Sequence, residues 1–371
     1  MQIGIDISRI ATATRTGTEQ YTYELLAALA QADTTTPYRL YCHRQPAHLP
    51  PLGANFQLRQ IPLARLWTHL RLSAEVLQHQ PDVLFVPAHV LPLATPLARR
   101  MCSVVTIHDM GYLRYPAAHT RAQRIYLRLS TLWSARVATR VIAISQATRA
   151  DLAQLARIDP QRIDVVYHGV SPRFGMAVDP AAAARIQQIS AGEPYLLYVG
   201  TVQPRKNLLR LIEALALVGR NRPTPRLLIA GRRGWLAAPI EHHAANLGIA
   251  DRVVFTGYVA DDDLPALYAG ALAFLFPSLY EGFGMPVLEA MASGTPVLTA
   301  RSSALPEVAG DAALLVDPHD TTAIAEGIRM LLDEPALRQA LRQAGRARAA
   351  QFTWEACAAA TRTILMQSAT H

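Results

Sequence analysis

Residues 195–207 decide the fold, and they read Tyr195-Leu196-Leu197-Tyr198-Val199-Gly200-Thr201-Val202-Gln203-Pro204-Arg205-Lys206-Asn207. The first five residues are a short apolar run typical of a buried parallel strand, and a helical pattern begins at Leu208. A glycine turn between a strand and a helix presents free backbone N–H groups and the positive end of the helix dipole. The stretch therefore predicts an α/β domain whose loop binds a diphosphate, the alternative being a loop that only caps the helix.

The two cations of this loop strengthen that interpretation. Arginine supplies 35 of the 36 basic residues, and Lys206 is the single lysine. Arginine is a flat fork and lysine a compact point charge, so a lone lysine indicates a site that needs a point charge on a flexible stem. The alternative is that this lysine remains by chance and has no special function. Fixed cations such as Arg205 and Lys206 stabilise the charge that develops on a leaving diphosphate.

A second motif follows the apolar run that closes at Pro277. It reads Glu281-Gly282-Phe283-Gly284-Met285-Pro286-Val287-Leu288-Glu289. Pro286 suits a first helical residue and Gly294 a C-terminal cap, so the glycines are predicted to form a loop that opens a helix, with Glu289 in its first turn. An ionised carboxylate can bind a vicinal diol, and glycines let the backbone approach a phosphate or sugar closely.

Apolar strand patterns alternate with helical ones in both halves of the chain, which is typical of βαβ units and parallel sheets. A chain of 371 residues also exceeds one ordinary core, so two domains are expected. We expect one Rossmann-like domain over 1–175, a second over 176–354 and a helix over 355–371 that packs back on the first domain. The predicted strands are 3–7, 39–42, 83–86, 103–107, 141–144, 195–199, 226–230, 252–255, 273–276 and 296–299.

Both motifs resemble the hallmarks of retaining glycosyltransferase family 4, also called glycosyltransferase group 1. That resemblance implies the GT-B architecture, in which two Rossmann-like domains with parallel sheets face each other across a cleft. It also implies that 1–175 is the acceptor domain and 176–354 the nucleotide-sugar donor domain. It extends over the whole chain, through the segments Gly17-Thr18-Glu19-Gln20-Tyr21, Val104-Val105-Thr106-Ile107-His108-Asp109, Val141-Ile142-Ala143-Ile144-Ser145 and Tyr167-His168-Gly169-Val170.

The resemblance also implies roles for individual residues. Arg205 and Lys206 would hold the diphosphate, Glu289 the ribose diol and Glu281 the hydroxyls of the donor sugar. His108 would touch the donor sugar from the first domain; a buried structural histidine is the alternative. The expected catalytic set is His108, Glu281, Arg205 and Lys206, and further donor contacts are expected from Gly17, Gly200, Tyr258, Gly282, Phe283, Gly284, Met285, Pro286 and Val287.

The net positive charge of the chain comes from its first half. Residues 1–175 hold 19 arginines and 10 acidic residues, whereas 176–371 hold 17 basic and 18 acidic residues. This asymmetry indicates an anionic partner, either a phosphorylated acceptor or an acidic membrane surface, unless the charge only keeps the protein soluble. No nucleic-acid-binding motif accompanies it, so nucleic acid is not an expected partner.

One helical pattern carries much of this charge, over residues 120–136. The pattern predicts an apolar face and an opposite basic face. The helix would either lie on a membrane or pack its apolar stripe on the sheet with the arginines in water. The apolar face is Ile125, Leu129 and Leu132, and the basic face is Arg121, Arg124 and Arg128.

No cofactor or metal is expected, only the nucleotide sugar as co-substrate. The acidic run Asp261-Asp262-Asp263 precedes a helical pattern and is predicted to cap that helix. Three distant cysteines, the lack of a secretory signal and the lack of a membrane span predict a cytoplasmic protein, or a peripheral one on the inner face of the membrane if the basic domain meets lipid.

The predicted activity is retaining hexosyl transfer, with mannose from GDP-mannose to a glycan or lipid-linked oligosaccharide as the first choice. The resemblance is to bacterial transferases that make cell-surface polysaccharide. A UDP-sugar donor, a sugar-nucleotide epimerase and a non-catalytic nucleotide-sugar-binding protein stay open as alternatives. A dehydrogenase is excluded by the absence of a glycine-rich turn after the first strand, and a pyridoxal-dependent phosphorylase would need a second lysine.

Overall fold

The computed structural model describes residues 1–11, 17–63, 66–116, 120–220, 222–232 and 237–369. The chain forms two compact units, the first made of Met1–Gly169 with Phe352–His371 and the second of Val170–Gln351. The predicted boundaries at 175 and 354 lie a few residues further along. Phe174 explains part of this difference, because its ring packs on Tyr268 of the second unit.

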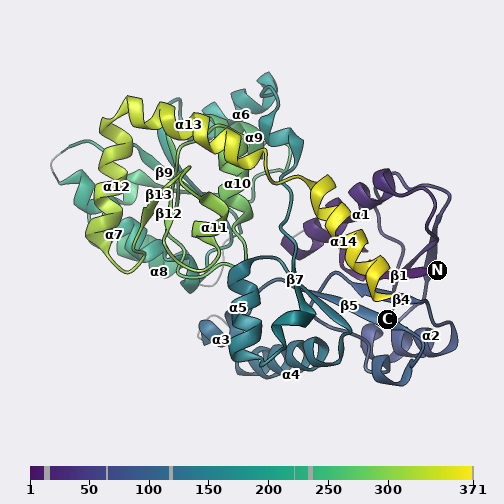
Figure 1. The fold of residues 1–371 in the computed structure, drawn as a ribbon. Coiled ribbons are helices and arrows are strands. Elements are labelled where there is room, and N and C mark those ends of the chain that lie inside the picture. Colours follow the sequence, from purple (N-terminus) through teal and green to yellow (C-terminus); the bar gives the residue numbers. More distant parts are fainter. Residues whose placement is uncertain (12–16, 64–65, 117–119, 221, 233–236, 370–371) are drawn as a thin grey trace. The chain divides into compact units, whose positions relative to one another are not determined.

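The first unit is built on a parallel sheet with strand order β3-β2-β1-β4-β5-β6-β7 (Figure 1). The central strands are almost wholly buried, as expected of a sheet covered by helices on both faces. The strands are β1 (Ile3–Asp6), β2 (Tyr38–Cys42), β3 (Phe56–Gln60), β4 (Val83–Val86), β5 (Cys102–Ile107), β6 (Arg140–Ala143) and β7 (Ile163–Val165).

Helices of the first unit come from both ends of the chain. The final helix α14 (Trp354–Ser368) packs against α1 (Gly17–Ala32) and contacts β4 and β5. The predicted apolar stripe of α1, from Tyr21 to Leu29, is buried as expected. The other helical segments are η1 (Ser8–Ala11), η2 (Thr68–Leu72, a π-helical turn), α2 (Ser73–Gln78), η3 (Thr95–Leu97), α3 (Gly111–Arg114), α4 (Arg121–Val137), α5 (Gln146–Leu155) and η5 (Pro160–Arg162).

The second unit repeats the plan with strand order β10-β9-β8-β11-β12-β13, all parallel. Each sheet therefore has the doubly wound arrangement predicted for a Rossmann-like domain. The strands are β8 (Tyr195–Val199), β9 (Arg226–Ala230), β10 (Val253–Gly257), β11 (Ala273–Phe276), β12 (Val297–Ala300) and β13 (Leu314–Val316).

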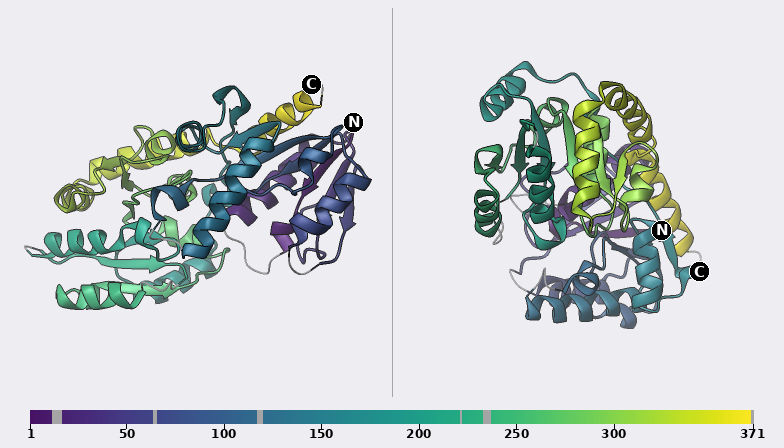
Figure 2. Two further views of the ribbon diagram at one scale, coloured as in Figure 1. Left: turned by 90° about the horizontal axis from the view of Figure 1, so that it is seen from below. Right: turned by 90° about the vertical axis from the view of Figure 1, so that its left-hand side faces the viewer.

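Helices also cover the sheet of the second unit (Figure 2). The helix α7 (Leu208–Gly219) packs on α12 (Thr321–Asp333) and α8 (Ala237–Asn246), and α10 (Met285–Ala292) packs on α13 (Pro335–Ala349) and α9 (Leu264–Ala269). The remaining segments are η6 (Pro172–Gly175), α6 (Pro180–Ser190), η7 (Pro204–Lys206), η8 (Ala250–Arg252) and α11 (Leu305–Ala309). Among the described residues, none of the helices is long and apolar enough to cross a bilayer.

The ten predicted strands are confirmed within one or two residues at each end, and three further strands were missed. The strand β3 is an edge strand whose last four residues are exposed, so its sequence Phe-Gln-Leu-Arg-Gln lacks a buried apolar run. The strands β7 and β13 have three residues each, too few to show a period.

The helix α4 differs from both parts of its prediction. Its buried side chains are small, namely Ser130, Thr131, Ser134 and Ala135, whereas Ile125 and Leu129 point to solvent. The interpretation that the apolar stripe packs inward is therefore wrong for Ile125 and Leu129, whereas Leu132 does pack against the core. The arginines also do not oppose the stripe, because Arg121 lies four residues before Ile125 and is its neighbour on the helix surface.

Candidate active site

The second unit brings the two predicted motifs together at the point where its strand order reverses. The central strand β8 has β9 on one side and β11 on the other. The chain leaves β8 toward one edge of the sheet and β11 toward the other, so the loops after these strands diverge and leave a crevice at their carboxyl ends. The loop after β8 carries Arg205 and Lys206, and the loop after β11 carries Glu281.

Asn207 fixes the first of these loops. It adopts a left-handed conformation with φ of 62° between η7 and α7. Its Nδ2 donates to the carbonyls of Pro277 and Pro318, at 3.0 and 2.7 Å. The Leu279 N–H donates to the carbonyl of Arg205 at 2.8 Å. The loops after β8 and β11 are thus tied together through their backbones, which holds the cations of one beside the carboxylate of the other.

The predicted glycine turn at Gly200 is also a point of close backbone approach. A Cβ at Gly231, which follows β9, would lie 2.3 Å from the carbonyl oxygen of Gly200. Both glycines have positive φ values, of 150° for Gly200 and 142° for Gly231. Glycine at both positions therefore lets the loops after β8 and β9 touch.

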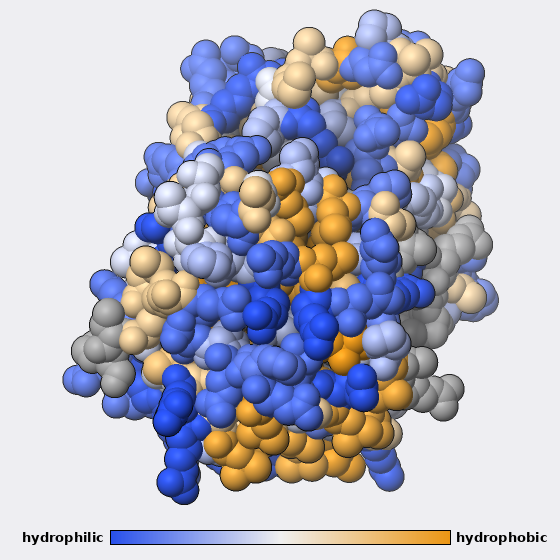
Figure 3. All heavy atoms as spheres, turned by 90° about the vertical axis from the view of Figure 1, so that its right-hand side faces the viewer, coloured by the Kyte–Doolittle hydropathy of each residue, from blue (hydrophilic) through white to orange (hydrophobic). Residues whose placement is uncertain are grey.

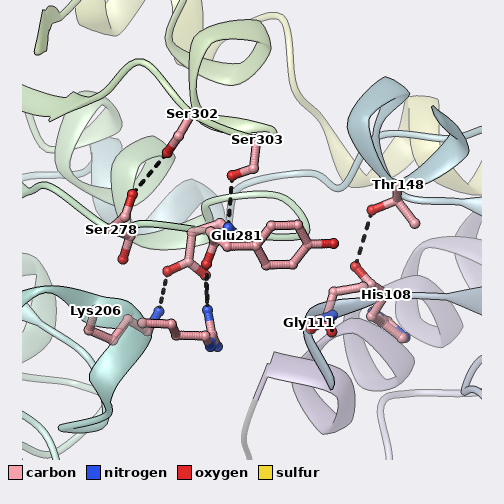
Figure 4. Close-up of polar contacts among 11 residues, drawn as sticks. His108, Gly111, Thr148, Lys206, Ser278, Glu281, Ser302 and Ser303 are labelled. Carbon is pink, nitrogen blue, oxygen red and sulfur yellow. Dashed lines mark hydrogen bonds and ion pairs between the residues drawn. The ribbon is translucent and has the colours of Figure 1, made fainter. Parts of the chain in front are cut away.

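A buried ion cluster joins the two predicted motifs (Figure 4). Lys206 Nζ lies 2.6 Å from Glu281 Oε1, and Arg205 Nη1 lies 2.8 Å from Glu281 Oε2. Arg205 Nη1 also donates to the carbonyl of Tyr280 at 2.9 Å. Lys206 is buried, with 7% of its surface exposed, and its ammonium stands 4.7 Å from the centre of the Phe276 ring. The single lysine of the chain is thus a point charge held between a carboxylate and an aromatic face.

Glu281 is ionised in this cluster. Burial raises the pKa of its carboxyl, but the charges of Arg205 and Lys206 and the hydrogen bond from Lys206 outweigh that effect and lower the pKa to about 2. Its backbone N–H donates to Ser303 Oγ at 2.8 Å. Ser303 has a left-handed φ of 49°, and sequence patterns did not indicate its role.

Glu289 lies deeper in its helix than predicted. The helix α10 starts at Met285, with Gly284 as N-cap, so Pro286 is the second helical residue and Glu289 the fifth, in the second turn. The prediction for Gly294 is confirmed, since its φ of 73° ends the helix. The Tyr268 hydroxyl donates to Glu289 Oε2 at 2.9 Å. Burial raises the pKa of Glu289, although Tyr268 and Arg173 act in the opposite direction.

Of the residues between the two glutamates, some form the turn before α10 and others pack against the rest of the unit. Gly282, Phe283 and Gly284 form the buried turn before α10, and a Cβ on Gly284 would lie 2.9 Å from Leu305. Met285 and Pro286 are half-buried. The Val287 side chain is in the core and its N–H donates to the carbonyl of Gly284, so Val287 presents neither group to a ligand.

Two further predictions concern Asp263, as a helix cap, and Tyr258, as a donor contact. Asp263 stands at the N-cap of α9 as predicted, but its carboxylate does not cap the helix and instead pairs with Arg185 at 2.5 Å. Tyr258 follows β10, is exposed, and donates from its hydroxyl to Asp261 at 3.2 Å. Its ring is thus exposed on the surface of the second unit, where a ligand can reach it.

Arg173 is a residue of this region that sequence patterns did not single out. Its charge acts on Glu289, Tyr268 and Tyr258, which places it among the residues expected to hold the nucleoside. Among the described residues its buried Nε has no hydrogen-bond partner. An arginine directly before the buried Phe174 is the only sequence signal, and that signal indicates packing rather than binding.

In the first unit, His108 directly follows β5 and is buried. Its Nε2 lies 3.0 Å from the carbonyl of Pro87. A carbonyl only accepts, so Nε2 carries the proton and Nδ1 of the neutral ring is an acceptor. Burial lowers the pKa of the imidazole, which keeps it neutral. Tyr21 packs edge-on against the ring, with centroids 4.9 Å apart.

Gly17 is the first residue of α1 and is exposed. A Cβ built on it meets no atom within 4 Å, so within the first unit no steric contact requires glycine there. Gly17 and His108 lie in the first unit, and the other predicted site residues lie in the second.

These features define a class of protein. The second unit has a nucleotide-binding fold with two cations and two acids at its switch point, suited to a ligand with a diphosphate and vicinal diols. Among the described residues, no three His, Cys, Asp or Glu side chains gather as a metal site would require. The arrangement is that of an enzyme that transfers a sugar from a nucleotide.

Comparison with known proteins agrees with this class. Residues 181–348 match the family model Glycosyl transferases group 1, and residues 15–174 match Glycosyltransferase Family 4. The O-antigen chain mannosyltransferase B of Escherichia coli is 33% identical over 82% of this chain and 80% of that protein. The MMP alpha-(1->4)-mannosyltransferase of Mycolicibacterium hassiacum is 33% identical over 61% of this chain and 54% of that protein.

A solved structure shows the same fold. The sucrose-phosphate synthase of Thermosynechococcus elongatus superposes with a TM-score of 0.76 over 99% of this chain and 98% of that one, at 23% sequence identity. The chain belongs to the glycosyl transferases of group 1, with the GT-B fold, and is a hexosyltransferase. It therefore acts on a nucleotide-sugar donor and a glycan acceptor.

Proposed function

We propose that the enzyme transfers mannose from GDP-mannose to a glycan, with retention of configuration and without a metal ion. The choice of mannose rests on the relatives, since both mannosyltransferases described above align with this chain at 33% identity. The single observation that carries the mechanism is the cluster of Arg205, Lys206 and Glu281.

The cluster supplies the charge that a metal would otherwise supply. As the glycosidic bond breaks, negative charge grows on the departing diphosphate, and fixed cations in a dry site stabilise it without reorganisation. The carboxylate of Glu281 orients Arg205 and Lys206 before the donor arrives. The protein binds the phosphates through these cations and the ribose diol through Glu289.

The state of Glu281 favours a same-face displacement over a covalent intermediate. Each of its oxygens is engaged by a cation, and a carboxylate with a pKa near 2 is a poor nucleophile and a poor base. In the proposed reaction the departing diphosphate helps to deprotonate the acceptor hydroxyl. The neutral His108, with Nδ1 as an acceptor, receives a hydrogen bond from a hydroxyl of the donor sugar.

We also propose that the acceptor is lipid-linked and that the enzyme meets it at the inner, anionic surface of a membrane. The support is the net positive charge of residues 1–175, which hold 19 arginines and 10 acidic residues. Such a surface attracts basic protein segments. A soluble glycoside is the alternative acceptor.

The test is a transfer assay in EDTA with GDP-mannose and, in parallel, UDP-glucose, using octyl α-mannoside as acceptor. We expect an α-linked mannoside, identified by the one-bond C–H coupling at its anomeric carbon. A β-linked product would contradict retention, and transfer from UDP-glucose alone would replace the donor. Consumption of the donor without any acceptor product would favour an epimerase.

A further inference from the structure

The helix α4 exposes apolar side chains that packing within the first unit does not explain. Ile125 is 61% exposed, Tyr126 52% and Leu129 66%. The helix contacts its own unit through a different face, where Ser130, Thr131, Ser134 and Ala135 are buried and Leu127, Leu132, Trp133 and Val137 pack against the core. Apolar side chains clustered on an exposed face mark an interaction surface, whereas single exposed ones are ordinary.

The same surface continues onto the segment at η2. The Tyr126 hydroxyl lies 3.4 Å from His69 Nε2, which places the two helical segments side by side. Beside His69, Leu70 is also exposed, as is Leu66 one turn earlier. Figure 1 has α4 along the lower edge of the first unit, and Figure 3 shows apolar side chains gathered along the lower edge with hydrophilic ones beside them.

The charge of the side chains around this surface indicates which class of partner it binds. The helix α4 carries arginines at 121, 124, 128 and 136 and no acidic residue, and the exposed Arg71 follows Leu70 on η2. Arg121 and Arg128 border the apolar stripe, one helical turn from Ile125 and Leu132. A symmetric contact between two copies would set these arginines against each other. Anionic lipid headgroups instead meet arginine while the acyl region receives the apolar side chains.

We infer that α4 and η2 form the surface by which this protein docks on an anionic lipid bilayer, with Ile125, Tyr126, Leu129 and Leu70 entering the interface. The inference rests on the proposed lipid-linked acceptor, because it names the surface that would bring the site to such an acceptor. The docking itself needs neither donor nor acceptor.

The test is co-sedimentation of the full chain with vesicles of phosphatidylcholine alone and with added phosphatidylglycerol. We expect binding only to the anionic vesicles, weakening as salt rises. The double variant Arg121→Gln/Arg124→Gln should lower the partition coefficient by about tenfold or more, and Ile125→Ser/Leu129→Ser should lower it similarly.

Matched controls keep the outcome clear. Arg99→Gln/Arg100→Gln removes two exposed charges of the same unit, and Leu247→Ser/Met330→Ser removes two exposed apolar side chains of the other. Both should bind vesicles like wild type. Equal binding by the α4 variants would overturn the inference, as would a dimer in sedimentation velocity that only these variants break.

A second readout separates this inference from the proposed function. Nucleoside diphosphate binding and transfer to a soluble glycoside should be unchanged in the α4 variants. Loss of vesicle binding with intact transfer supports the docking surface. If the wild-type protein binds vesicles but transfers no sugar, the docking surface is supported and the proposed reaction is contradicted.

Discussion

Glu281 stays a carboxylate at any pH at which the protein works, because Arg205 and Lys206 hold its pKa near 2. A carboxyl whose pKa is lower in the folded than in the unfolded chain stabilises the fold above the unfolded value and loses that contribution as pH falls through the folded value. The cluster therefore remains intact down to strongly acidic pH. Donor binding that weakens at milder acidity must have another cause.

Glu289 supplies that cause, since burial shifts its pKa upward. We predict that Glu289→Gln weakens binding of the nucleoside diphosphate by about tenfold or more, through loss of a charged hydrogen bond to the ribose. The wild-type affinity should fall as pH drops through the raised pKa of Glu289, and the variant should lose this dependence. Calorimetric titration over pH measures both.

The same substitution should stabilise the fold. A raised pKa contributes stability that is fully present below the unfolded value and lost as pH rises, so the ionised Glu289 is unfavourable at neutral pH. We expect Tm of Glu289→Gln to rise by about 1–3 °C at pH 7. The exposed Glu326→Gln is the control and should leave both binding and Tm unchanged. A fall in Tm would contradict a buried, unfavourable charge.

At the scale of elements, apolar runs were sufficient to predict the central strands, and the 3.6-residue period of α1 predicted its buried face. The edge strand β3 could not be predicted, because exposed edges carry no apolar pattern. The helix α4 was predicted at the right residues, but the side to which its apolar stripe faces was not. Ile125 and Leu129 are exposed while Leu132 packs against the core, and a sequence period alone does not distinguish a core-facing stripe from an outward one.

The helix α14 is an element whose position tests the organisation of the first unit. Trp354 is buried, with its ring stacked on His168 at 5.8 Å and near Tyr21 at 6.0 Å. We predict that Trp354→Ala destabilises the first unit by about 3–5 kcal/mol, as is usual for a large core aromatic. Hydrogen exchange should rise in α1 and α14 while the second unit keeps its protection.

A neighbouring residue provides the control for this prediction. Glu355 is exposed on the same helical turn, so Glu355→Ala should leave exchange unchanged. Faster exchange in the second unit instead of the first would show that α14 stabilises the second unit, which would contradict the prediction.

At the scale of the whole molecule, the site was predictable where its chemistry lies in short motifs. Strand, glycine turn and cations marked the loop at Arg205 and Lys206, and paired acids around glycines marked the loop at Glu281. The direct contact between these motifs could not be predicted, because it depends on β8 and β11 being neighbours in the sheet. Arg173 and Ser303 were missed because single residues in loops carry no pattern.

We propose that Lys206, Arg205 and Glu281 form a donor site that needs no metal. Calorimetric titration of the protein with GDP and with UDP, in buffer containing EDTA, tests this proposal, with Lys206→Ala as the test variant and the exposed Arg220→Ala as the control. We predict that one nucleotide binds wild type and Arg220→Ala alike and at least about tenfold more weakly to Lys206→Ala. Equal binding by Lys206→Ala, or binding that appears only when a divalent metal replaces EDTA, would contradict it.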